Sequence, residues 1–178
     1  MVSEIRVILK KMHIILVYTI DKVYTFLYNG GEKELIEMLT MNATEVRKNW
    51  SEVSESVIRE KPKFIKKTRD YMMLSNIDFI NTLLSGYEFS AKKYIEEDGS
   101  VTLSLNEIAL VENAPTEEEA IRLLSNSILE YAMDFYNDFN FWSSAPNKKS
   151  EIPYVFKALA LDDAEKIGEC IKCQAGEN

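Results

Sequence analysis

The stretch from Met41 to Asp78 constrains the fold of this chain more than any other, because strand, helix and turn signals follow one another there in a fixed order. Met38 to Met41 is a short apolar segment that predicts a strand, and Asn42 is a residue type that caps helices. Apolar residues then recur at spacings of four, three and four, which predicts a helical region with one buried face: Val46, Trp50, Val53 and Val57.

The helical region ends at Pro62, because proline lacks the backbone N–H that a helix needs. Strand-forming residues over Lys63 to Thr68 and Tyr71 to Ser75 flank Arg69-Asp70, which predicts a basic hairpin whose turn has no glycine. Ile77 to Ser85 then predicts a short helix ended by Gly86. We therefore predict a first module over residues 38–85 with the order β-α-α-β-β-α.

This order resembles the N-terminal half of the Phd/YefM (prevent-host-death) antitoxins over residues 38–80. The residues that carry the resemblance are Asn42, Ala43, Glu45 and Arg47 before the amphipathic helix, Lys61-Pro62 before the hairpin, and Asp78-Phe79 after it. The missing turn glycine and the polar Ser54 and Ser56 depart from the family pattern. The resemblance implies a bacterial type II antitoxin: a homodimeric DNA-binding module that represses its own operon, joined to a part that neutralises a toxin.

The candidate DNA-binding residues lie at the start of the first helix and in the hairpin. Arginine suits guanine because its fork of N–H groups donates two hydrogen bonds to one base edge, and lysines contact phosphates. The candidates are Asn42, Thr44, Arg47, Lys48, Lys66, Lys67 and Arg69.

A second module is predicted over residues 87–178. Apolar residues alternate with polar ones from Tyr87 to Ala91 and again from Val101 to Leu105, on either side of the turn signal Asp98-Gly99, and Ile108 to Val111 predicts a third strand. Thr116 and Glu119 form a capping box that opens a long amphipathic helix. Its apolar stripe, which forms either core or a binding surface, is Leu124, Ile128, Tyr131, Phe135, Phe139 and Trp142. The predicted fold class is α+β.

The sequence GSVTLSLNEIALVENAPTEEEAI resembles HicB-type antitoxin domains, a second similarity that covers residues 87–140. Such domains carry a degenerate RNase-H-like sheet. The resemblance implies a partner-binding sheet without nuclease chemistry.

Charge divides the chain in the same way. Residues 38–70 carry eight basic and five acidic side chains, whereas residues 71–178 carry eight basic and nineteen acidic ones. A basic patch suits a polyanion, and an acidic region suits a basic protein partner. The candidate toxin-binding residues are Glu117, Glu118, Glu130, Asp134, Phe135 and Trp142. The helix predicted near Ser150 has an apolar face that either packs on the module or receives the toxin.

Residues 1–37 precede both resemblances, and we expect them to be either a disordered leader or translated upstream DNA, with the true start at Met38 or Met41 in the second case. Ile20-Asp21-Lys22 and Tyr28-Asn29 can be encoded by the two hexamers of a bacterial promoter, and Lys33-Glu34 by a ribosome-binding site. Export by a signal peptide is the alternative, but no small-residue cleavage site follows the apolar run.

Catalysis is not expected. The single histidine, His13, lies in residues 1–37, which removes histidine-based triads and metal sites from the rest of the chain. Asp98, Glu107 and Glu112 are conceivable ligands of a small metal-dependent nuclease, but turn and surface carboxylates are the favoured explanation of all three. Cys170 and Cys173 are the only cysteines and form no disulfide scaffold.

The predicted protein is a cytoplasmic antitoxin and autorepressor with no cofactor, no metal and no membrane segment. Its partners are operator DNA, a cognate toxin and a second copy of the chain. The alternative is a DNA-binding regulator with a ligand- or protein-sensing C-terminal domain and no toxin.

Overall fold

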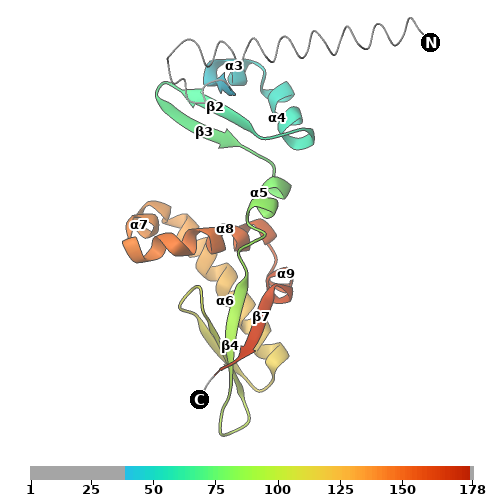
Figure 1. The fold of residues 1–178 in the computed structure, drawn as a ribbon, viewed down its shortest axis with the longest axis vertical. Helices are drawn as coiled ribbons and strands as arrows, with labels where there is room; N and C mark the ends of the chain where they lie inside the picture. Colours follow the sequence, from blue (N-terminus) through green and yellow to red (C-terminus); the bar gives the residue numbers. More distant parts are fainter. Residues whose placement is uncertain (1–38, 177–178) are drawn as a thin grey trace, which may run out of the picture. The chain divides into compact units, whose positions relative to one another are not determined.

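The computed structural model describes residues 39–176, which form two compact units divided after Leu74 (Figure 1). The first unit contains β1 Thr40–Asn42, α3 Ala43–Lys48, α4 Trp50–Arg59, β2 Lys63–Lys67 and β3 Asp70–Leu74. The second contains α5 Ile77–Leu83, β4 Phe89–Ile95, β5 Val101–Leu105, β6 Val111–Ala114, α6 Glu117–Asn137, α7 Phe139–Ser144, the 3-10 helix η1 Pro146–Glu151, α8 Ile152–Leu161, α9 Ala164–Glu169 and β7 Ile171–Ala175. The chain is therefore α+β, as predicted. The expected upstream extension, with His13, lies outside the described residues.

The first unit is a three-stranded sheet of order β1-β2-β3 with two helices. β1 pairs in parallel with β2, and β2 pairs antiparallel with β3. The two helices connect the parallel strands, since parallel pairing requires a crossover. Four apolar side chains are buried between helices and sheet: Val46, Val53, Val57 and Ile65.

Trp50 is the exception to the predicted buried stripe, because its side chain is 55% exposed. The four-residue spacing from Val46 assumed one continuous helix. Instead α3 ends at Lys48, and Asn49 lies between the two helices with non-helical dihedrals. This break changes the helical phase, so Trp50 does not share the buried face of Val46.

The hairpin turn lies one position earlier than predicted. Lys67 pairs with Asp70, so Thr68 and Arg69 form the two-residue turn and the second strand begins at Asp70. Thr68 has φ +60°, a left-handed conformation that glycine adopts most readily. The chain therefore builds the tight turn without glycine, at a cost in backbone strain.

The sheet of the second unit has four strands rather than the predicted three, in the order β6-β5-β4-β7. The third strand covers Val111–Ala114 and not Ile108 to Val111, because residues 106–110 form the bent connection from β5 to β6, in which Ile108 is buried in the core. The fourth strand, β7, pairs in parallel with β4. This strand was not predicted from the sequence, and it places Cys173 within the sheet.

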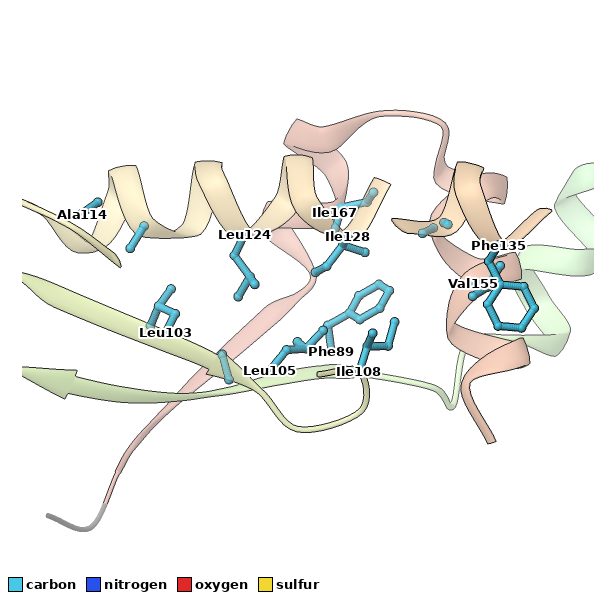
Figure 2. Packing of buried hydrophobic residues seen from close by; sticks show 14 of the residues in the cluster. Phe89, Leu103, Leu105, Ile108, Ala114, Leu124, Ile128, Phe135, Val155 and Ile167 are labelled. Atoms are coloured by element: carbon cyan, nitrogen blue, oxygen red, sulfur yellow. The ribbon is translucent and has the colours of Figure 1, made fainter. Parts of the chain in front are cut away.

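The core of the second unit lies between this sheet and α6, which runs along one face of the sheet (Figure 1). Leu124 and Ile128 point from α6 toward the strand residues Leu103 and Phe89 (Figure 2). Phe135 continues the same stripe beside Val155 of α8 (Figure 2). The predicted amphipathic helix is thus the main core element of this unit.

The start of α6 is set by a capping residue, and its end differs from the predicted one. Thr116 accepts a hydrogen bond from the Glu119 backbone N–H at 3.2 Å, which starts α6 as predicted. The helix ends at Asn137, so Phe139 and Trp142 belong to a separate helix, α7, although both still pack on the core. Within residues 39–176, no helix has both the length and the apolar character that crossing a membrane requires.

The helix α5 was expected to belong to the first module, which was predicted to extend to residue 85. In the structure it belongs to the second compact unit, where it packs against α8. Asn76 caps it by accepting a hydrogen bond from the Phe79 backbone N–H at 2.8 Å.

Candidate nucleic-acid interface

Asn42 joins the first strand to the first helix and sets the geometry of the candidate site. Its side-chain oxygen accepts a hydrogen bond from the Thr44 backbone N–H at 2.8 Å, which caps α3. The helix buries Val46 and leaves the next residue, Arg47, exposed. Arg47 is therefore available for a ligand near the start of the unit.

The parallel pairing of β1 with β2 brings the hairpin to the same place. Asn42 lies opposite Lys66 in the register, so the last residue of β1 adjoins the basic end of β2. Lys66 also lies over the Tyr71 ring, with 5.1 Å between its ammonium nitrogen and the ring centroid. This aromatic contact holds part of the lysine side chain against the hairpin.

Residues from these two segments line one hollow of about 600 Å³. Its lining residues are Asn42, Ala43, Thr44, Arg47, Lys66, Lys67 and Thr68. We call this the cationic hollow, because three of its side chains are positively charged and none is acidic. Five of the seven candidate DNA-binding residues line it, although more than twenty positions of sequence separate Asn42 from Lys66. Lys48 and Arg69 are exposed nearby in the chain but are not lining residues.

A second hollow, of about 380 Å³, lies on the same unit, and we call it the apolar groove. Its lining residues are Ala43, Val46, Arg47, Trp50, Ile65, Met72, Met73 and Leu74. Ala43 and Arg47 line both hollows, so the two adjoin. Sequence reasoning missed the groove. The sequence signal for this groove was the run of four apolar residues in β3. A strand with only one buried face would instead alternate apolar and polar residues.

The acidic candidates for toxin contact divide into different environments. Glu117 forms an ion pair with Lys93 of β4 at 3.0 Å. Glu118, Glu130 and Asp134 are exposed on α6. Phe135 is fully buried in the core, so it cannot contact a partner from there and we remove it from the candidate surface.

Trp142 is half-buried in an aromatic and polar cluster on α6, α7 and η1. Its ring stacks on Phe135 at 5.8 Å between centroids, and the Lys148 ammonium lies 5.7 Å from its ring centroid. Lys148 also donates hydrogen bonds to Tyr131 at 3.1 Å and to the buried Glu151 at 2.9 Å, and the Tyr131 hydroxyl donates to Glu151. Trp142 therefore has a structural role in this unit.

The cluster shifts two of its own pKa values. Burial raises the pKa of the Tyr131 hydroxyl, and its hydrogen bond to Glu151 adds to the increase. Burial by itself lowers the pKa of Lys148, but the hydrogen bonds to Tyr131 and Glu151 outweigh this, so the net pKa is raised. Both groups therefore lose their protons at a higher pH in the folded chain than they would without these interactions.

The carboxylates proposed as metal ligands have separate structural partners. Asp98 accepts from the Ser100 backbone N–H at 2.9 Å in the β4–β5 turn, and Glu107 accepts from the Ser90 backbone N–H at 3.0 Å. Glu112 accepts from the Ser127 hydroxyl. In the described part of the chain, no three histidine, cysteine, aspartate or glutamate side chains gather where they could hold a metal ion.

The two cysteines are free thiols. Burial raises the pKa of the Cys173 thiol, and the neighbouring Glu117 raises it further. A raised pKa reduces the reactive thiolate form. Cys173 is therefore part of the sheet packing.

Comparison with known proteins gives two matches to this architecture. Residues 38–173 match the PHD_like family, described as antitoxin of toxin-antitoxin, RelE / RelB, TA system. A crystal structure from Syntrophomonas wolfei subsp. wolfei, described as an antitoxin part of a proposed toxin/antitoxin system, has 33% sequence identity and a TM-score of 0.73. The similarity covers 77% of this chain and 99% of that chain. No curated protein matches the chain.

The fold and the family match define a small α+β antitoxin of a toxin-antitoxin system. The chain belongs to the PHD_like antitoxin family. The predicted similarity to toxin-antitoxin antitoxins is confirmed, whereas the HicB-like similarity of residues 87–140 stays a prediction.

Proposed function

We propose that this antitoxin binds operator DNA as a homodimer through its first unit, and that its acidic second unit neutralises a toxin by direct contact. In this proposal it represses its own operon in the cytoplasm. The Phd/YefM-like arrangement covers residues 38–85, of which α5 packs with the second unit, and the partner-binding part covers residues 87–178. The observation that carries the proposal is the cationic hollow, in which Arg47, Lys66 and Lys67 meet from two distant segments.

The chemistry of the cationic hollow suits a DNA backbone beside a base edge. Lysines attract phosphates without reading sequence, so Lys66 and Lys67 supply affinity. Arg47 projects from a helix, and its guanidinium fork suits guanine in the major groove. The hollow therefore accounts for both general affinity and sequence preference.

The apolar groove supports the homodimer. Trp50, Met72 and Met73 are exposed there in the single chain, and contact with a second copy would remove them from water. Such a dimer would carry two cationic hollows, which matches a palindromic operator with two half-sites.

Family membership supports the toxin as a partner, and charge supports the second unit as the part that contacts it. Residues 71–178 carry eight basic and nineteen acidic side chains. This acidic unit would be repelled by DNA and attracted to a basic protein.

The DNA part is tested by titrating Arg47→Ala and Lys67→Ala chains against the upstream region of the operon and against scrambled duplexes. A lost bidentate contact costs about 1–3 kcal/mol per site, and the dimer has two. We expect Arg47→Ala to weaken operator binding about a hundredfold or more and to flatten sequence preference. Lys67→Ala should weaken binding to all DNA alike and reduce the salt slope by about two per dimer.

The matched control is Lys92→Ala, which removes an exposed lysine from β4 of the second unit. It should leave both affinity and salt slope unchanged. The repressor proposal is wrong if the unsubstituted chain binds its upstream region no better than scrambled DNA.

A further inference from the structure

The C-terminal half of α6 exposes large apolar side chains although the core of its unit is closed. Met133 is 52% exposed and Tyr136 is 57% exposed, and the two are neighbours because residues three apart lie on one side of a helix. Adjacent exposed apolar side chains of this size mark contact surfaces.

Uncompensated acidic charge lies beside these side chains. Glu130 and Asp134, one turn apart on α6, are exposed, and neither has an ion-pair partner among residues 39–176. In the N-terminal half of the same helix, Glu117 pairs with Lys93 and Glu119 with Arg122. Glu118 is exposed there too, but it lies in the first turn, where the positive end of the helix dipole favours a carboxylate. Glu130 and Asp134 have neither an ion pair nor this favourable position.

This placement is unfavourable for the isolated helix. Asp134 lies in the last turn of α6, where the partial negative charge of the helix C-terminus repels a carboxylate, and Glu130 repels it from four residues away. The last turn of α6 contains no basic residue that would offset this. A cationic partner would relieve both repulsions.

We infer that Met133, Tyr136, Glu130 and Asp134, here called the α6 face, bind a cationic amphipathic segment of the toxin. Apolar side chains of that segment would cover Met133 and Tyr136, and its lysine or arginine side chains would pair with the two carboxylates. The inference rests on the proposed function, in which the second unit contacts a toxin directly. A second copy of this chain does not fit, because a symmetric contact would place carboxylates against carboxylates, and nucleic acid is repelled by the same charge.

The experiment uses the full chain and, as probe, the purified product of the gene adjacent to it. Two variants change the α6 face: Met133→Lys, and the double variant Glu130→Lys with Asp134→Lys. We expect each to weaken binding of that product at least tenfold, and the loss in the double variant to shrink at high salt because it is electrostatic. The midpoint temperature of thermal unfolding should not fall in the double variant, because a lysine near a helix C-terminus is favourable. Loss of binding will then not reflect loss of fold.

Matched controls change equally exposed residues elsewhere on the same unit. Ile95→Lys replaces an exposed apolar side chain at the end of β4, and Glu97→Lys reverses an exposed charge in the β4–β5 turn. Both should bind the probe like the unsubstituted chain. If the α6 variants also bind normally, the α6 face is wrong while the antitoxin proposal stands. If the unsubstituted chain does not bind the probe, the proposed toxin contact and this inference are both wrong.

Discussion

The two units of this antitoxin differ in how completely they bury their apolar side chains. The first has a core of four buried residues and leaves Trp50, Met72 and Met73 exposed around the apolar groove. The second closes a core of fifteen buried residues between α6 and its sheet, and includes the fully buried Phe89 and Phe135. Small domains bury a smaller fraction of their surface than large ones, so the first unit is the one that gains most from a partner.

This difference indicates that the two units derive their stability from different sources. We expect the second unit to be stable by its own packing, and the first to depend on association with another copy. Fluorescence can separate the two, because the chain has two tryptophans and each unit contains one, Trp50 and Trp142. A Trp142→Phe chain reports on the first unit, and a Trp50→Phe chain reports on the second.

The largest effect is expected from a substitution that leaves a cavity in the core of the second unit. Phe135→Ala should destabilise the second unit by about 3–5 kcal/mol, because it removes a fully buried aromatic side chain and leaves a cavity. Urea denaturation followed by circular dichroism measures the loss. Phe141→Ala, at an exposed position of α7, is the control and should change stability by less than about 0.5 kcal/mol. A loss below about 1 kcal/mol for Phe135→Ala would contradict the assignment of this core.

The next effect concerns the apolar groove of the first unit. Met72→Lys should raise the dissociation constant of the proposed homodimer about a hundredfold, or about 2.7 kcal/mol, because each copy would place a charge in the apolar contact. Sedimentation over a range of concentrations measures it. Ile95→Lys changes a similarly exposed apolar residue of the second unit and should leave the dimer intact. Unchanged dimerisation of Met72→Lys would remove the proposed difference between the units.

A smaller effect should be confined to the second unit. Thr116→Ala removes the side-chain oxygen that caps α6 and should cost about 1 kcal/mol. Thr116→Ser keeps a hydroxyl and serves as the control. The Trp50→Phe background should detect the loss and the Trp142→Phe background should not. Equal losses in both backgrounds would mean that the two units unfold as one.

The smallest effect is a dependence on alkaline pH. The pKa of Tyr131 is raised from its usual 10.0 in the folded chain, so the unfolded chain releases this proton first as the pH rises. The stability that comes from neutral Tyr131 is present below pH 10 and is lost as the pH passes through the raised pKa. Lys148, whose pKa is raised from 10.5, contributes with the same sign. Tyr131→Phe should therefore flatten the fall in stability above pH 10, measured by urea denaturation at several pH values. An unchanged slope would show that the cluster does not control this titration.

Local signals in the sequence predicted local structure well. Thr116 caps its helix, and Asn42 caps the first helix, both through contacts within three residues. The hairpin signal Asp98-Gly99 also holds, and Gly99 adopts φ +83°. Each of these features depends only on neighbouring residues, so the sequence contains all the information that it requires.

Predictions failed where partners are distant in the chain. The strand β7 pairs with β4, from which most of the second unit separates it in the sequence. A parallel pair has no hairpin turn, so no local sequence signal predicts it. The compact unit that contains α5 is decided by its packing on α8. Trp50 was placed on a buried face because a one-residue break in the helix is not visible in apolar spacing.

The candidate site shows the same limit. Residue type was enough to select Arg47, Lys66 and Lys67 one by one, because the charge of a side chain is known from the sequence. Their meeting in one hollow depends on the parallel register that sets Asn42 opposite Lys66. Composition likewise showed that the second half of the chain is acidic, whereas the fold decided that Phe135 is core and that its neighbour Tyr136 is exposed. Periodicity limits which side chains share a helix face, but only packing against the sheet and α8 determines which face is buried.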